Sequence, residues 1–145
     1  MARMERSIEI NVPPEKVWPL MQLDRWPEWY IPLKKVEWTS KDKNKVGSTY
    51  HQIVQLGRNK GKADGEITEV AENEKISMRS TNGPMKGTGV ISLSPTKAGT
   101  KVTVAFEYEL AYSVLGKLID KVSFHKALDE SYDVALKKLK GMLEK

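Results

Sequence analysis

The sequence contains no cysteine, and only two of its 145 residues are histidines, His51 and His125. The absence of cysteine excludes disulfide bonds, thiolate nucleophiles and sulfur-ligated metals. A zinc site built on the two histidines would need carboxylates to complete it. We therefore expect neither a bound metal ion nor any other cofactor.

Long apolar runs are also lacking. No segment approaches the roughly 18 consecutive apolar residues that a membrane-spanning helix needs. The opening residues MARMERSIEI carry charges where a signal peptide would have an unbroken apolar stretch. The sequence therefore predicts a soluble cytoplasmic protein. Its 145 residues fit one domain, 1–145, with a single hydrophobic core.

The net charge of +5 comes from one segment. Residues 41–62 carry six basic residues and one acidic residue, an excess equal to that of the whole chain. The basic residues lie in turns on either side of a predicted strand: Lys41, Lys43, Lys45, Arg58, Lys60 and Lys62. Because charged turns usually face water, we favour solvated loops and expect no nucleic acid partner. A patch that binds phosphate or transiently contacts a membrane surface is the alternative.

Alternation of apolar and polar residues predicts most of the fold. A strand at residues 7–12 is followed by two short helices, at about 13–21 and 24–30. Six further strands are predicted between turn signals, at residues 34–40, 48–56, 61–70, 75–80, 86–94 and 100–110. From about residue 114 to 143, apolar residues recur at steps of three and four, which predicts one long helix. Short connections favour antiparallel hairpins, and we expect the helix to lie across the concave face of the sheet.

This order of elements resembles the SRPBCC superfamily of START-like proteins, and within it the polyketide cyclase/dehydrase and lipid-transport branch. The resemblance is carried by SIEINVPPEKVWPLMQLDRWPEWY, by ITEVAENEKISMRSTNGPMKGTG, and by GTKVTVAFEYEL followed by LGKLIDKV. It implies an α+β helix-grip fold, in which a seven-stranded curved antiparallel sheet wraps around a long C-terminal helix, with two short helices between the first two strands. The superfamily includes both lipid carriers and aromatases, so the fold leaves the function open.

The resemblance also implies a deep cavity between the sheet and the long helix. Such a cavity would bind or transport a hydrophobic small molecule, such as a lipid, an isoprenoid, a quinone or an aromatic polyketide. The residues expected to bind this ligand are Trp29, Tyr30, Trp38, Tyr50, Gln52, Val54, Ile67, Met78, Met85, Gly87, Gly89, Ile91, Val104, Phe106, Tyr108, Leu115, Leu118, Ile119 and Val122.

Small residues on the predicted inner face favour such a hollow. Gly87 and Gly89 share a face with Ile91, and Ala63 and Gly65 share one with Ile67. Small side chains on the buried face of two strands leave space. The alternative is that these glycines mark bends of a strongly curved sheet.

Residues 49–56 can present either of two faces to the cavity. One face carries Tyr50, Gln52, Val54 and Leu56, and the other carries His51 and its alternating neighbours. We prefer the first face because its apolar area is larger, which would leave His51 at the surface.

Tryptophans gather near the first helices. We expect Trp18 and Trp38 to pack into the core. Trp26, Trp29 and Tyr30 lie on the second predicted helix. They either plug one end of the core or line the entrance of the pocket, and both interpretations stay open.

The candidates for catalysis are few. His125 and Asp129 stand four residues apart in the long helix, so they can form a hydrogen-bonded pair suited to proton transfer, or both can turn to solvent. Tyr108 brings a phenol into an apolar setting. We favour a noncatalytic carrier. The alternatives are an enzyme similar to the cyclases, in which Tyr108, His51 or the His125 and Asp129 pair moves protons, and a module that engages a protein or membrane surface.

Overall fold

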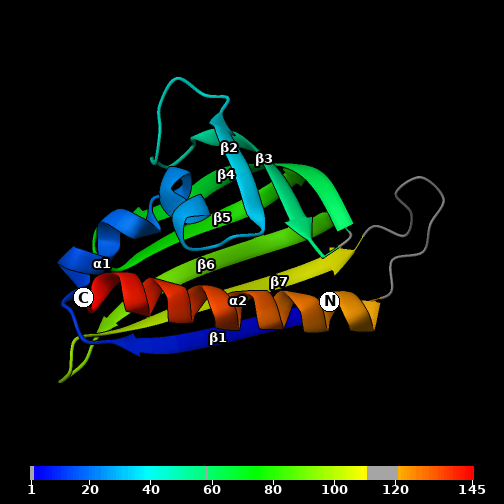
Figure 1. Ribbon diagram of the computed structural model, residues 1–145. Coiled ribbons are helices and arrows are strands. Elements are labelled where there is room, and N and C mark those ends of the chain that lie inside the picture. The colour runs from blue at the N-terminus through cyan, green and yellow to red at the C-terminus, as the bar shows by residue number, and fades with distance from the viewer. Residues whose placement is uncertain (1, 58, 111–120) are drawn as a thin grey trace.

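The computed structural model describes residues 2–57, 59–110 and 121–145. Figure 1 shows the elements along the chain. They are β1 (Ala2–Ile10), α1 (Pro14–Met21), the 3₁₀ helix η1 (Leu23–Glu28), β2 (Leu33–Trp38), β3 (Thr49–Leu56), β4 (Asn59–Ala71), β5 (Lys75–Asn82), β6 (Met85–Pro95), β7 (Thr100–Leu110) and α2 (Lys121–Leu143).

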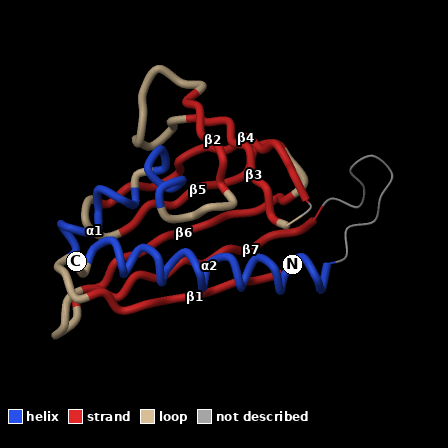
Figure 2. The backbone as a smooth tube through the Cα atoms, in the orientation of Figure 1, coloured by secondary structure: helices blue, strands red, loops and turns tan. Residues whose placement is uncertain are grey.

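The strands form one seven-stranded antiparallel sheet in the order β1-β7-β6-β5-β4-β3-β2. Figure 2 shows α2 running along β1 and β7, with α1 near the C-terminal end of α2. The 3₁₀ helix η1 packs against α1 and β2. Leu128, Tyr132, Leu136 and Leu139 of α2 are buried at steps of three and four residues. The sheet therefore wraps around one apolar face of the helix, which confirms the predicted helix-grip fold.

Strand β1 begins five residues earlier than predicted, at Ala2. Residues 2–6 were missed because Arg6 interrupts the apolar alternation on the inner face. The Arg6 guanidinium lies 3.4 Å from Asp129 and 3.5 Å from Asp133, both on α2. A charge on an inner face is tolerated when it meets opposite charges, and here it ties β1 to the long helix.

Two helices differ from their predicted extents. The predicted helix at 24–30 is the shorter η1, a 3₁₀ helix that contains Pro27, whose missing N–H limits regular hydrogen bonding. The long helix is described from Lys121. Residues 114–120 of the prediction lie outside the described residues. Within the described part of the chain, no helix combines the length and apolar character needed to span a membrane.

Trp26 of η1 and Trp29, which directly follows η1, hold this helix against the end of α1. The indole N–H of Trp26 donates to the Met21 carbonyl at 2.9 Å, and that of Trp29 donates to the Leu20 carbonyl at 2.8 Å. The last carbonyls of a helix lack intrahelical donors, so the two indoles satisfy groups that would otherwise be unpaired. Both side chains are buried, with exposed fractions of 3% and 0%.

Candidate functional site

A cavity of about 1000 Å³ lies between the inner face of the sheet and α2. Strands β3 to β7, η1 and α2 all contribute to its wall. Pockets that enclose small molecules usually measure about 300–1000 Å³, so this cavity lies at the upper end of that range. The residues predicted to bind ligand that line it are Tyr30, Tyr50, Gln52, Val54, Met78, Met85, Gly87, Gly89, Phe106 and Tyr108.

The other predicted ligand residues lie elsewhere. Five of them belong to the packed core or lie against it: Trp29, Trp38, Ile67, Ile91 and Val104. Val122 faces solvent, with 79% of its surface exposed. Leu115, Leu118 and Ile119 lie outside the described residues. Alternation along a strand shows which side chains point inward. It does not show which of these side chains pack against a helix and which face the cavity.

Several lining residues were missing from the prediction. They include a row on α2, Phe124, Leu128 and Tyr132. The α2 residues recur at steps of four, so they form one stripe of the helix. This periodicity is visible in the sequence, and it is the signal that identifies these α2 residues as facing the sheet. Of the tryptophan-rich segment, Trp26 and Tyr30 line the cavity, while Trp29 is enclosed in the core.

Strand β3 presents Tyr50, Gln52, Val54 and Leu56 to the cavity. His51 points to the outer face, where its Nδ1 lies 2.7 Å from a carboxylate oxygen of Asp64 on β4. His51 is therefore separated by the sheet from the other candidate catalytic groups.

The inward glycines provide room for aromatic rings. Tyr50 pairs with Gly65, and Phe106 pairs with Gly89, across neighbouring strands. A Cβ atom at Gly65 would collide with the phenol of Tyr50, and one at Gly89 would collide with the ring of Phe106. The space above these two glycines is thus covered by a neighbouring ring. At Gly65 the pairing of β4 with β5 also shifts register, which agrees with the alternative that this glycine marks an irregularity of the sheet.

Gly87 has a different role from these two glycines. A Cβ atom there would collide with the main-chain carbonyl of Glu107 on β7. Glycine allows the close approach of the two backbones at this position.

Tyr108, His125 and Asp129 lie in a row between the cavity and α2, in which Tyr108 is hydrogen-bonded to His125 and His125 lies close to the Asp129 carboxylate. The Tyr108 hydroxyl lies 2.7 Å from Nδ1 of His125. Nε2 of His125 lies 3.4 Å from a carboxylate oxygen of Asp129, and the same oxygen lies 3.4 Å from the Arg6 guanidinium. The fold therefore brings together three of the four candidate catalytic residues.

The direction of the hydrogen bond between Tyr108 and His125 depends on the tautomer of the imidazole. In the neutral tautomer that carries its proton on Nε2, Nδ1 has a lone pair and accepts the Tyr108 proton. Burial raises the pKa of Tyr108, and the negative charge of Asp129 raises it further. Tyr108 is therefore a neutral phenol at neutral pH, and its oxygen faces a cavity that it lines.

Two further phenols of the cavity are paired with other groups. The Tyr30 hydroxyl lies 2.9 Å from Oγ of Ser131, and its ring stacks on Tyr132 at a centroid distance of 4.2 Å. Burial raises the pKa of Tyr30 to about 12 and that of Tyr132 well above its ordinary value. Both phenols therefore add polar but uncharged surface to the wall.

The described lysines of the basic segment are all exposed, and two of them also border the cavity. Lys41, Lys43 and Lys45 are exposed in the connection between β2 and β3. Lys60 and Lys62 of β4 contribute to the cavity wall. Arg58 lies outside the described residues. The three exposed lysines agree with the interpretation as solvated loops.

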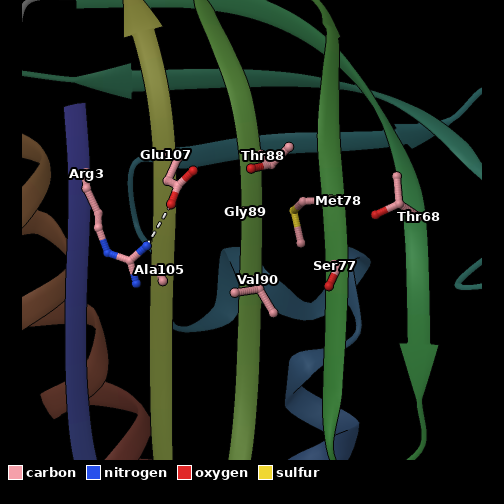
Figure 3. Close-up of a pocket in the computed structure, with 9 residues that line it drawn as sticks. All are labelled: Arg3, Thr68, Ser77, Met78, Thr88, Gly89, Val90, Ala105 and Glu107. Carbon is pink, nitrogen blue, oxygen red and sulfur yellow. Dashed lines mark hydrogen bonds and ion pairs between the residues drawn. The ribbon is translucent and has the colours of Figure 1, made fainter. Parts of the chain in front are cut away.

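A second hollow, of about 360 Å³, lies on the outer face of the sheet. Figure 3 shows its small side chains, among them Ser77, Thr88 and Ala105, and the ion pair of Arg3 with Glu107 beside them. The Arg3 and Glu107 side chains are more than half exposed. This hollow lacks the enclosing helices that cover the inner face, so the inner cavity is the candidate site.

Solved structures share this fold. The protein TTHA0849 from Thermus thermophilus is 20% identical with a TM-score of 0.79, over 98% of this chain and 97% of that one. The Zhui aromatase/cyclase from Streptomyces sp. R1128 is 15% identical with a TM-score of 0.82, over 99% and 93%. A START superfamily protein from Mycobacterium smegmatis is 18% identical with a TM-score of 0.78, over 98% and 97%. At these identities the likeness shows the fold alone.

The sequence itself identifies the family. A comparison with curated proteins found no match. The family described as polyketide cyclase / dehydrase and lipid transport matches residues 1–144, almost the whole chain. This agrees with the motifs that resemble the SRPBCC superfamily and with the helix-grip architecture. The chain therefore belongs to the polyketide cyclase/dehydrase and lipid transport family.

Proposed function

We propose that the protein binds and carries a hydrophobic small molecule in the inner cavity. The observation that carries this proposal is the size of the cavity, about 1000 Å³, within walls that are largely apolar. A ligand that fills this space removes its own apolar surface and that of the cavity wall from water, and this burial is the driving force for binding.

The expected affinity follows from the buried area. A ligand that buries about 300 Å² of apolar surface gains roughly 7 kcal/mol at 25 cal/mol per Å². Part of this gain is lost to the ordering of ligand and side chains, so we expect dissociation constants of roughly tens to hundreds of micromolar. Lipids, isoprenoids, quinones and aromatic polyketides all offer this much apolar surface.

A neutral apolar fluorophore, N-phenyl-1-naphthylamine, tests the proposal. We expect saturable binding of about one probe per chain, with a dissociation constant of roughly tens to hundreds of micromolar. Ala127→Trp places a large ring in the cavity wall on α2, and it should weaken binding by about tenfold or more. The matched control is Val134→Trp, at a position on the same helix that is 65% exposed, and it should bind like the wild type.

The proposal would be wrong if the folded wild-type protein bound the probe without saturation. It would also fail if Ala127→Trp remained folded and bound the probe as tightly as Val134→Trp, because the probe would then lie outside the cavity.

A second candidate function is an enzyme of the cyclase or dehydratase type. It is favoured by the 2.7 Å contact between the Tyr108 hydroxyl and His125, at the wall of the cavity. When His125 is protonated, its Nδ1–H donates to Tyr108, and the phenol proton is free to point toward a ligand oxygen. Tyr108 would then give its proton to a ligand hydroxyl group as the C–O bond breaks and the group leaves as water, and Tyr108 would recover a proton from Nδ1 of His125. The double bond would form with the electrons of a neighbouring C–H bond, whose proton passes to water.

Tyr108→Phe and His125→Gln separate the two functions. A carrier should keep its affinity for N-phenyl-1-naphthylamine within about threefold in both variants, since the probe needs no proton. The compounds that co-purify with the protein are extracted, identified by mass spectrometry and incubated with each variant. Conversion of such a compound by the wild type, and its loss in both variants, would favour the enzyme over the carrier.

A further inference from the structure

The inner face of β3 carries an amide side chain, that of Gln52. Along this face Gln52 lies between Tyr50 and Val54, and all three residues line the cavity. Across the sheet Gln52 pairs with Val36 on β2 and with Ala63 on β4. The side chains of both cross-strand neighbours are apolar, so neither of them can form a hydrogen bond with the amide.

The Gln52 amide has no hydrogen-bond partner among the described residues. In the same part of the chain, the unpaired polar atoms that are completely enclosed belong to Arg6, Trp38 and Ser80. Gln52 is half-buried and is not one of these residues, so its amide oxygen and nitrogen remain open to the cavity that the residue lines. A molecule bound in the cavity can therefore contact both atoms.

A carboxamide places an accepting oxygen beside a donating NH2 group. A ligand that displaces water from this part of the wall removes the hydration of both groups, and an amide left without a partner then weakens binding. A ligand group with a donor beside an acceptor replaces both hydrogen bonds. An ionised carboxylate replaces only the bond to the NH2 group, because it has no donor for Oε1 of Gln52. The amide therefore favours a neutral group.

We propose that Gln52 forms a subsite for a neutral polar group of the ligand in which a hydrogen-bond donor lies beside an acceptor, as in an amide, a lactam or a hydroxy ketone. This inference rests on the proposed function as a carrier and adds the chemical class of the ligand. The apolar part of the ligand packs against other residues of the same cavity, among them Phe106 on β7 and Phe124 and Ala127 on α2.

Three probes of nearly the same shape test the subsite: 2-naphthamide, 2-acetylnaphthalene and 2-isopropenylnaphthalene. The ketone has a methyl group in place of the NH2 group of the amide, and the alkene also has a CH2 group in place of the carbonyl oxygen. Their dissociation constants are measured by competition with N-phenyl-1-naphthylamine. The quantity compared is the dissociation constant of the alkene divided by that of the amide, because the change in this ratio between two proteins cancels the hydration of each probe.

We expect the ratio to be about tenfold higher in the wild type than in Gln52→Leu, since leucine is similar in size but forms neither hydrogen bond. With the ketone in place of the amide, which keeps only the acceptor, we expect a difference of about threefold. Gln55→Leu is the matched control and should keep the wild-type ratio. Gln55 is exposed on the outer face of β3, where its side chain donates to the Gly57 carbonyl at 3.5 Å.

An equal ratio in the wild type and Gln52→Leu would overturn the subsite, because water would then satisfy the amide as well as the ligand does. The same loss in Gln55→Leu would overturn it too, as would failure of all three probes to displace a fluorophore that does bind. Unfolding in urea should show Gln52→Leu to be at least as stable as the wild type, and a clear loss of stability would mean that the amide already has a partner within the chain. If the fluorophore itself does not bind to the folded wild type, the carrier function fails, and the subsite fails with it.

Discussion

Replacing Trp29 by alanine is expected to lower the free energy of unfolding by about 4 kcal/mol. The side chain is fully buried and lies 4.9 Å from the ring of Trp26, measured between centroids. Its truncation would leave a large cavity and would also remove the indole N–H that donates to the Leu20 carbonyl. Urea denaturation followed by circular dichroism measures the loss.

Two variants make this result specific. Trp29→Phe keeps an aromatic ring but loses the hydrogen bond, so we expect a smaller loss of about 1–2 kcal/mol. Ile31→Ala, at a nearby position that is 47% exposed, should change the free energy by no more than about 0.5 kcal/mol. If Trp29→Ala were as stable as Ile31→Ala, Trp29 would not hold η1 against α1 as described.

Gly87→Ala is the second substitution from which we expect a large effect, a loss of about 3 kcal/mol in the free energy of unfolding. The added methyl group would meet the main-chain carbonyl of Glu107, which cannot move without disturbing the pairing of β6 with β7. A clash with a flexible side chain could be relieved by a change of rotamer, whereas this one requires the strands to separate.

Gly61→Ala is the matched control for this prediction. Gly61 also lines the cavity, but the nearest atom to an added Cβ is Cγ of Pro84, at 3.6 Å. Because alanine restricts the unfolded chain without straining the folded one, we expect a gain of about 0.5 kcal/mol. Equal stability of Gly87→Ala and Gly61→Ala, measured by urea denaturation, would contradict the close approach at Gly87.

The faces of the strands could be predicted because their side chains alternate strictly. The choice of Tyr50 rather than His51 for the inner face rested on apolar area alone, and the structure places Tyr50 on that face. Alternation does not specify the register between strands, however. The covering of Gly65 by Tyr50 and of Gly89 by Phe106 depends on register, so the glycines were interpreted without their aromatic neighbours.

Contacts between elements that are far apart in the sequence could not be predicted from the sequence pattern either. Helical spacing predicts that His125 can meet Asp129, because residues four apart share one face. No spacing rule relates either residue to Tyr108, which lies on β7. Their contact depends on how α2 crosses the sheet, and that crossing is fixed by tertiary packing.

The arrangement of β1 beside β7 has consequences for how the chain folds. Ile10 pairs with Thr100, and Ala2 pairs with Tyr108, so these partners are separated by about a hundred residues. The hairpins between β2 and β7 involve near neighbours and can form while synthesis continues. Strand β1 must wait, with Met4 and Ile10 in contact with water, until β7 has left the ribosome. At about 5–20 residues per second this delay lasts several seconds, during which the unpaired strand is exposed to aggregation and to chaperones.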